Sequence, residues 1–347
     1  MAKAKAKTGA KAKAKDKWTA ERVLGMARGF QPACVLMAGA ELDVFGVLAG
    51  GAKSAAGLAE AIGGDSRATA MLADALTAMG LLEKSAAGRY CLAEGVAEVL
   101  TERGAASAVA MVRHNANCMR NWAQLAKVVR TGRRAERQPS VRGAAADLES
   151  FIEAMQVVNR QAAGSLVARI GPPPFKHLLD VGGGPATWTI EFLRSAGPAS
   201  RATLFDLPDV LPIAEKHLRE AGLLGRVTLA GGNFQTDPAL PAGADLAWVS
   251  AIVHQNSRAE NRDLFRKVHA ALAPGGAVLV RDMVMDESRT VPADGAMFAV
   301  NMLVNTPGGG TFTFRELSED LAAAGFAEAV LLVRDEGMCS VVQARKP

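Results

Sequence analysis

Hydrophobic and polar residues follow two different patterns, one before and one after the cluster Gly171-Pro-Pro-Pro. Before it, apolar residues recur three or four positions apart, which is typical of helices with one buried face. After it, short apolar runs alternate with amphipathic helical segments, which is typical of strands buried on both faces. Because a proline cluster cannot continue a helix, these residues mark a natural boundary. The sequence therefore predicts a mainly helical first part and an α/β second part.

The segment 18–100 reads as short helices separated by glycines and followed by two short strands. The predicted elements are a helix over 31–48, a helix capped by Ser54, a helix capped by Asp65 or Ser66, and a hairpin over 81–92 with an Ala-Ala-Gly turn. Helices followed by a hairpin in this order are typical of a winged helix-turn-helix. Within the third helix, residues 67–79 carry one basic and one acidic residue, whereas DNA contacts need several basic side chains on one face. We therefore expect a packing or dimerisation module rather than a DNA reader.

Longer helices are predicted over residues 104–170, with a surface loop at TGRRAERQPS, residues 131–140. From Lys176 onward, strands alternate with helices. The predicted strands cover 177–184, 202–207, 226–234, 245–253, 277–285 and 328–335. Apolar strands in this alternation indicate a parallel sheet covered by helices on both faces, with ligands at the carboxyl ends of the strands.

Charge along the chain is uneven. The 347 residues carry a net charge of +5, yet residues 1–17 alone hold seven lysines and one aspartate, so the remainder sums to −1. The Ala-Lys alternation has no apolar face, and we expect a disordered tail. We expect this tail to act as a solubilising leader; the alternative is weak non-specific contact with nucleic acid or anionic surfaces.

Composition otherwise fits a soluble globular protein, with 49% apolar and 22% charged residues. No apolar run is long enough to span a bilayer, and no apolar block follows the lysines as in a secretory signal. The four scattered cysteines (Cys34, Cys91, Cys118, Cys339) favour neither a disulfide scaffold nor a metal site. They fit a reducing cytoplasm, and we expect no specific nucleic-acid or membrane partner.

A glycine loop and two aspartates suggest a nucleotide site. Asp180 ends the first predicted strand and precedes Gly182-Gly183-Gly184, and Asp206 ends the second, where a carboxylate can accept from ribose hydroxyls. Nicotinamide enzymes share these features. However, Thr187 stands where their glycine motif requires a glycine or alanine, which disfavours a dinucleotide.

The order of motifs resembles the class I fold of S-adenosylmethionine-dependent methyltransferases. More narrowly, LLDVGGG, LFDLPDV, the strand leading to His254 and LAPGGAVLV resemble the small-molecule O-methyltransferases of plants and bacteria. That family includes the caffeate, acetylserotonin and hydroxyneurosporene enzymes, and the resemblance covers about residues 20–346. It implies a Rossmann-like, doubly wound, mostly parallel sheet behind a winged-helix dimerisation domain.

The same resemblance implies a homodimer that uses S-adenosylmethionine. Together with the lysine-rich pattern of the tail and the proline boundary, it divides the chain into four predicted parts. These are a tail over 1–17, a dimerisation domain over 18–103, a helical linker lining the pocket over 104–170, and a catalytic domain over 171–347.

The resemblance also implies a set of cofactor residues. The set comprises Asp180, Gly182, Gly183, Gly184, Asp206, Asn233, Phe234 and Ser250. Asn233 stands where the family often has an aspartate for the adenine amino group, and its carbonyl can accept the same bond. Phe234 is expected to stack on the adenine. Ala186 replaces a frequent glycine, which is tolerable only if its φ is negative.

For catalysis, the resemblance implies His254 as general base and Asp282 as the carboxylate that orients it. A phenol, with a pKa of about 10, is a poor nucleophile at neutral pH, so a neutral imidazole must take its proton. Thr311 stands where a plant enzyme has a second orienting glutamate, so only one acid is supported. Among the other histidines, His114 could face the pocket, whereas His217 and His269 read as surface or packing residues.

Met155, Met297, Met302 and Asn305 are expected to line the acceptor pocket, where methionines would form an adaptable apolar wall. The predicted function is O-methylation of a small, hydroxylated, aromatic metabolite. Because only one acid orients His254, methylation of sulfur or carbon stays open. A winged-helix regulator that senses a ligand is the alternative outside catalysis.

Overall fold

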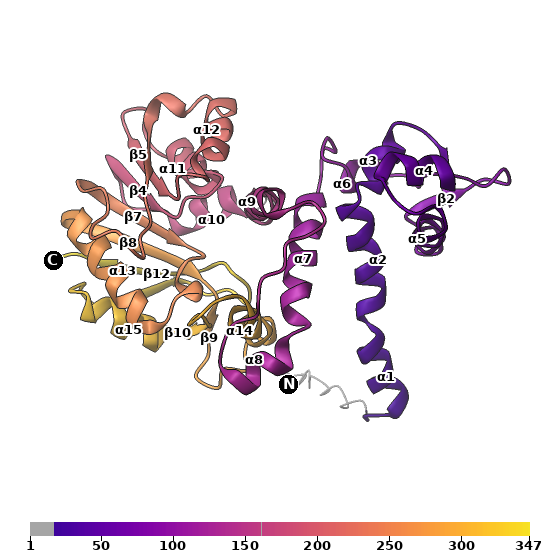
Figure 1. Cartoon of the computed structure of the whole chain (residues 1–347). Coiled ribbons are helices and arrows are strands. Elements are labelled where there is room, and N and C mark those ends of the chain that lie inside the picture. Colours follow the sequence, from indigo (N-terminus) through magenta and orange to yellow (C-terminus); the bar gives the residue numbers. More distant parts are fainter. Residues whose placement is uncertain (1–16, 161) are drawn as a thin grey trace, which may run out of the picture.

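The computed structural model describes residues 17–160 and 162–347. Figure 1 shows an α/β part and a helical N-terminal module, with α7 (Val109–Trp122) and α9 (Ala144–Arg160) between them. The predicted tail, apart from Lys17, lies outside the described residues. None of the helices in the described ranges is both long and apolar enough to cross a membrane.

The N-terminal module is a helical bundle with a small antiparallel sheet. Its helices are α1 (Ala20–Arg28), α2 (Phe30–Glu41), α3 (Val44–Ala49), α4 (Ala55–Ile62), α5 (Ser66–Ala78) and α6 (Val96–Leu100). Its strands β1 (Lys53–Ser54), β2 (Leu82–Lys84) and β3 (Arg89–Leu92) pair in the order β1-β3-β2. The predicted caps are confirmed, because Ser54 accepts from the Gly57 N–H at 3.2 Å and Asp65 from the Ala68 N–H at 2.8 Å.

The single helix predicted over 31–48 is wrong. Asp43 adopts a left-handed conformation with φ 56°, which ends α2 and starts α3. Aspartate tolerates this conformation better than most residues. Arg113 on α7 reaches this break and donates to the Ala40 carbonyl at 2.9 Å and to the Asp43 carboxylate at 3.3 Å. The apolar pattern continued through the break, so periodicity alone did not reveal it.

Four helices connect the module to the sheet: α7, α8 (Leu125–Thr131), α9 and α10 (Ala163–Ile170). As predicted, a loop separates α8 from α9, and α10 ends before the prolines at Gly171, whose φ is 55°. The loop is not wholly on the surface. Ala135 is buried, and its N–H donates to the Val304 carbonyl at 3.0 Å, which fastens the loop to α14 (Ala293–Asn305).

The central sheet has seven strands in the order β11-β12-β8-β7-β4-β5-β6. They are β4 (His177–Val181), β5 (Arg201–Asp206), β6 (Val227–Gly231), β7 (Ala244–Ser250), β8 (Leu272–Asp282), β11 (Val330–Val333) and β12 (Ser340–Arg345). β12 pairs antiparallel with both β8 and β11, and the other pairs are parallel, so the sheet is mostly parallel as predicted. The sequence did not predict β12. The expected Pro-Gly-Gly turn lies inside β8, with Gly275 at φ 75°.

Helices cover both faces of the sheet. They are α11 (Thr187–Ser195), α12 (Leu211–Glu220), α13 (Arg258–Ala271), α14 and α15 (Phe314–Ala323), with short turns η1 (Leu224–Arg226) and η2 (Val253–Gln255) and a small pair β9 (Val284–Met285)–β10 (Phe312–Thr313). Side chains alternate between faces along each strand. Val249 and Val280 therefore pack in one core cluster with Phe265 of α13, while Trp248 and Leu279 pack in another under α11.

Candidate active site

His254 lies in η2, directly after β7, and its imidazole faces a carboxylate at the end of β8. Its Nδ1 is 2.9 Å from Oδ1 and 3.0 Å from Oδ2 of Asp282, and both residues are buried, at 6% and 1% exposure. Because an ionised carboxylate only accepts hydrogen bonds, Nδ1 carries the proton and Nε2 keeps its lone pair. The ring of Phe298 on α14 packs edge-on at 4.8 Å between centroids. This arrangement fixes the orientation of the His254 ring and leaves its Nε2 able to accept a proton.

The glycine-rich segment 307–310 packs on the backbone of this histidine. The Gly310 N–H donates to the His254 carbonyl at 2.9 Å, and a Cβ at Gly309 would lie 2.4 Å from the same oxygen. Glycine is therefore required at position 309. Within the described ranges, Asp282 is the only side chain hydrogen-bonded to the His254 ring. The carbonyl of Thr311 accepts from Arg289 at 3.1 Å, and its side chain supplies no acid.

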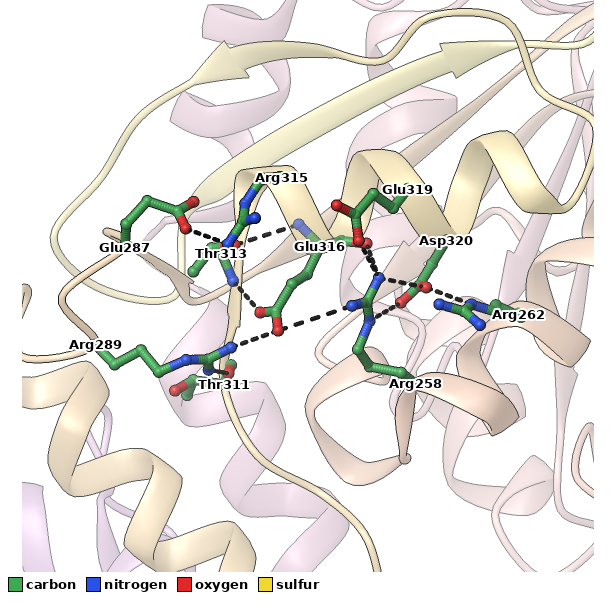
Figure 2. A network of polar contacts seen from close by, with 10 residues as sticks. All are labelled: Arg258, Arg262, Glu287, Arg289, Thr311, Thr313, Arg315, Glu316, Glu319 and Asp320. Atoms are coloured by element: carbon green, nitrogen blue, oxygen red, sulfur yellow. Dashed lines mark hydrogen bonds and ion pairs between the residues drawn. The ribbon is translucent and has the colours of Figure 1, made fainter.

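An ion-pair network connects the residues directly after this segment, Thr311 and Thr313, with the helix that follows His254 (Figure 2). Glu316 accepts from Arg289 and from the Thr313 N–H, and it lies 3.9 Å from Arg258 on α13. Arg258 in turn donates to Asp320 at 2.8 and 3.0 Å, and Asp320 is buried. The network ties α13, α15 and the loop before α14 together.

Buried amides hold the turn of His254 from the other side. Asn261 donates to the Val253 carbonyl at 3.0 Å and accepts from Asn256 at 3.1 Å, and Asn256 accepts from Gln235 at 3.3 Å. Sequence reasoning missed these residues. The available signal was an asparagine inside the apolar face of a helix, at Asn261, which is fully buried.

The glycine loop after β4 uses left-handed backbone at three positions. Gly182, Gly184 and Ala186 have φ of 67°, 52° and 64°, so the expectation that Ala186 avoids positive φ is wrong. An alanine there costs about 1–2 kcal/mol of strain. Ala186 is fully buried in a cluster with Leu204, which compensates the strain through packing.

Two carboxylates lie beneath and beside this loop. Asp180 is buried and accepts from the Thr189 hydroxyl at 2.5 Å. Its pKa is raised to about 7, mainly by burial and in part by the nearby Asp206, while the bond from Thr189 opposes the rise. Asp206 accepts from the N–H groups of Gly184 and Leu207, both at 2.7 Å. Burial raises the pKa of Asp206, and these two bonds oppose the rise. Its oxygens retain lone pairs for a further donor.

The remaining cofactor candidates lie at neighbouring strand ends. The Asn233 carbonyl accepts from the Gln235 N–H at 2.9 Å, which leaves it one acceptor position. Phe234 lines a cavity bounded by α13 together with Gln235 and Asn256. Ser250 accepts from Arg281 at 2.9 Å.

The predicted acceptor residues do not share one environment. Met155 on α9 is half-buried and Met302 on α14 is buried, but Met297 is 59% exposed. Asn305 is held between helices, because its carbonyl accepts from Asn121 at 2.6 Å and its amide donates to Asn301.

The other histidines take up packing positions. His114 packs on Phe151 at 5.1 Å, with Cys118 3.5 Å from its Nε2, and burial lowers its pKa. His217 is buried rather than on the surface, with Nδ1 3.0 Å from the Pro185 carbonyl.

Buried polar atoms that lack hydrogen-bond partners indicate whether a ligand fits this site. The carbonyl of Asn159 on α9 and the hydroxyl of Thr187 on α11 are buried with no hydrogen-bond partner in the described parts of the chain. A Cβ at Gly184 would meet nothing within 4 Å, so the loop is open on that side. These open polar atoms, together with the free lone pairs of Asp206, fit a polar ligand such as a nucleoside. Residues 17–160 and 162–347 hold no group of three potential metal ligands among His, Cys, Asp and Glu.

Comparison with known families identifies the chain. Residues 111–327 match the O-methyltransferase domain, and residues 24–103 match the O-methyltransferase dimerisation domain. The chain belongs to the O-methyltransferase family. It is therefore an S-adenosylmethionine-dependent methyltransferase, and its sheet is that of the class I methyltransferase fold.

Alignments with individual relatives cover most of this O-methyltransferase and most of each relative. The tetracenomycin polyketide synthesis 8-O-methyltransferase of Streptomyces glaucescens is 32% identical over 330 residues, covering 94% of this chain and 96% of that protein. The 3-hydroxy-5-methyl-1-naphthoate 3-O-methyltransferase of Streptomyces sahachiroi is 30% identical over 311 residues, covering 87% and 88%. The crystal structure of human N-acetylserotonin methyltransferase in complex with S-adenosylmethionine superposes with a TM-score of 0.75 at 26% identity, covering 96% and 99%.

Proposed function

We propose that this O-methyltransferase methylates a phenolic hydroxyl of a small fused-ring aromatic metabolite, with His254 as general base. The observation that carries the proposal is the buried His254–Asp282 pair at the carboxyl ends of adjacent strands. Two relatives named for a polyketide and for a hydroxynaphthoate support the acceptor class. The low aromatic content of the chain, 5%, favours an apolar pocket wall built from methionines over stacked aromatic rings.

The proposed mechanism assigns each residue a step. When bound, S-adenosylmethionine supplies an electrophilic methyl group. Asp282 holds the His254 ring by Nδ1 and stabilises the imidazolium that forms. Nε2 accepts the phenolic proton as the oxygen attacks. Phe298 covers one edge of the imidazole and keeps water away from it.

The cofactor residues are assigned from their free hydrogen-bonding capacity. Asp206 would accept from the ribose hydroxyls with the lone pairs that the Gly184 and Leu207 N–H groups leave open. Leu207 is exposed and apolar, so it would contact one face of the adenine while Phe234 contacts the other. Asn233 would accept from the adenine amino group. The glycine loop and the carboxyl of Asp180 would lie under the methionine arm.

Transfer of an isotope-labelled methyl group tests the function. The purified enzyme is incubated with labelled S-adenosylmethionine and a set of hydroxynaphthoates, each matched with its methoxy analogue. We expect label in the hydroxy compounds alone, because the methoxy analogue has no proton for His254 to accept. Transfer to thioether or ring-carbon acceptors with none to any hydroxyl would overturn the proposal in favour of sulfur or carbon methylation.

We further infer a homodimer formed through the N-terminal module. Apolar side chains on α1 and its flanks are exposed; they are Trp18, Val23, Leu24, Met26 and Phe30. Large exposed apolar surfaces of this kind mark association sites. Sedimentation of the chain lacking residues 1–17 should give a dimer, and Met26→Asp should shift it toward monomer. A wild-type monomer at micromolar concentration would contradict the inference. The four free cysteines suit action in a reducing cytoplasm.

A further inference from the structure

His217 on α12 lies between two acceptor groups that belong to different parts of the chain. It is buried at 6% exposure, with Nδ1 3.0 Å from the Pro185 carbonyl and Nε2 3.6 Å from a carboxylate oxygen of Glu153 on α9. A carbonyl and an ionised carboxylate cannot donate hydrogen bonds. A neutral ring that donates to Pro185 would therefore turn the Nε2 lone pair toward the carboxylate. Both contacts are favourable together only when the ring is an imidazolium.

The charge of this imidazolium is balanced from α9. In the described ranges, Glu153 is the only acid that forms an ion pair with His217. On α12 itself, the charged neighbours Lys216 and Glu220 are exposed. The glycine loop, α11 and β5 face α12 with apolar side chains, which are Ala186, Ile190 and Leu204. Loss of the ring proton would therefore weaken the contact with α9 and keep the bond to Pro185.

The same two helices bound a cavity of about 520 Å³. It is lined from α9 by Ala144, Ala145, Leu148 and Glu149, and from the segment after β5 by Asp209 and Ile213. Asp209 closely follows Asp206, so the cavity adjoins the strand end proposed to hold the ribose of the methyl donor. Glu153 lies one helical turn beyond Glu149, and His217 one turn beyond Ile213. The ion pair therefore joins the two walls just beyond the cavity.

The bond to Pro185 connects this ion pair to the glycine loop. Pro185 stands between Gly184 and Ala186, whose left-handed backbones have φ of 52° and 64°. The buried ring is thus fixed to the loop, whereas the Glu153 side chain is 28% exposed and lies on a helix outside the sheet. Of the two contacts, the one with Glu153 is the one that can open without disturbing the loop.

We propose that Glu153 and His217 form a latch that holds α9 against α12 and slows the exchange of the methyl donor and its demethylated product. The latch is closed while the ring is an imidazolium and opens when the ring becomes neutral. Both residues are positioning residues, because they act through α9 and not on the reacting atoms. The assignment rests on the proposed placement of the donor over Asp206 and the glycine loop.

Release of S-adenosylhomocysteine, the demethylated donor, tests the latch. The full-length protein is loaded with labelled compound and chased with excess unlabelled compound at several pH values. Glu153→Ala should release the label about three to ten times faster than the wild type at acid pH, as expected for the loss of one charged contact. At alkaline pH the wild-type rate should approach that of the variant, because the neutral ring no longer holds Glu153.

Glu153→Gln separates the contact from its charge. The amide can accept from the protonated ring or donate to Nε2 of the neutral ring, so release should stay slower than in Glu153→Ala at every pH. Glu215→Ala is the matched control, because Glu215 pairs with Arg219 along α12 and does not join two elements. It should keep the wild-type rate. Asp180 titrates in all four proteins, so rates are compared as variant-to-wild-type ratios at the same pH.

Three outcomes decide between the possibilities. A wild-type release rate from Glu153→Ala at acid pH would overturn the latch, as would an equal acceleration in Glu215→Ala. Failure of the wild type to bind S-adenosylhomocysteine would overturn the placement of the donor and the latch with it. The expected rates in a protein that methylates no hydroxyl would support the latch and overturn only the proposed acceptor, because release of this compound does not involve the acceptor.

Discussion

Nδ1 of His254 lies 2.9 Å from Oδ1 and 3.0 Å from Oδ2 of Asp282, and the His254 backbone N–H lies 3.4 Å from the same carboxylate. Asp282 ends β8 and His254 follows the adjacent parallel strand β7, so the sheet itself sets their separation. The Gly310 N–H holds the histidine backbone from the opposite side. Ring and backbone are thus both fixed, which is the geometry a proton acceptor needs before the acceptor molecule arrives.

Replacing His254 should lower the rate of methyl transfer without weakening the binding of S-adenosylmethionine. In His254→Ala, turnover should fall by about two to four orders of magnitude, which is the usual contribution of a positioned base. S-adenosylmethionine affinity, measured by calorimetry, should stay near that of the wild type. If the acceptor is a phenol, raising the pH should restore part of the activity, because hydroxide then supplies the phenolate. A variant with wild-type turnover would show that another residue is the base or that the acceptor carries no proton.

Asp282→Asn should reduce turnover less than His254→Ala. An asparagine keeps the shape and can still accept from Nδ1 through its carbonyl, but it no longer stabilises the imidazolium by charge. Loss of the carboxylate should therefore appear in kcat, with the KM for the donor unchanged. Steady-state kinetics with both substrates distinguishes this from a general loss of structure. An effect larger than that of His254→Ala would mean that Asp282 acts for itself and not through the histidine.

The sequence predicted those parts of the site that depend on strand order. Asp206 and Asp282 end their strands, Asp180 is the last residue but one of β4, and His254 follows β7. Parallel strands bring their carboxyl ends to one edge of the sheet. Local pattern and strand order were therefore enough to place them on the sheet edge. They were not enough to show which partners each side chain would take.

Features set by tertiary contact could not be read from periodicity. Ala186 takes a left-handed backbone because burial beside Leu204 outweighs the strain, which no local propensity indicates. Asn305 is engaged by a helix that lies far away in the sequence, through Asn121. The sequence pattern did not predict β12, because this short strand follows β11 after a loop, with no helix between the two strands. Arg281 was visible as an arginine in an apolar strand, but only the structure shows that it has no ion pair among the described residues.

Glu316 should position His254 from a distance. It caps α15, pairs with Arg289 and lies beside Arg258, so its loss loosens the segment that carries Gly310 (Figure 2). Glu316→Ala should lower kcat while leaving S-adenosylmethionine affinity unchanged, and should lower the free energy of unfolding by about 1–2 kcal/mol through the lost cap and pair.

Glu287→Ala is the matched control for this network. Glu287 pairs with Arg315 in the same view, but both side chains are exposed and neither contacts the glycine segment. It should change neither kcat nor stability appreciably, because exposed ion pairs contribute little. If both variants lowered kcat alike, the effect would belong to surface charge and not to the position of His254.

Asp180 should make the apoenzyme less stable as the pH rises. Its pKa is raised to about 7 in the folded chain, mainly by burial, above the ordinary value of 3.8 for an aspartate. The folded state therefore binds a proton that the unfolded state releases, so its contribution to stability is complete below about pH 4 and is lost as the pH rises through about 7.

Asp180→Asn isolates this contribution, because the amide is uncharged and nearly isosteric with the protonated acid. The wild type should lose stability relative to Asp180→Asn by roughly 1 kcal/mol per pH unit between about pH 5 and 7, and the difference should level off above that. Urea unfolding of both proteins without S-adenosylmethionine measures it. Because the Thr189 hydroxyl lowers the Asp180 pKa, Thr189→Val should move the levelling-off to higher pH. Parallel stability curves for wild type and Asp180→Asn would show that Asp180 is already ionised in the folded protein, which would contradict a pKa raised by burial.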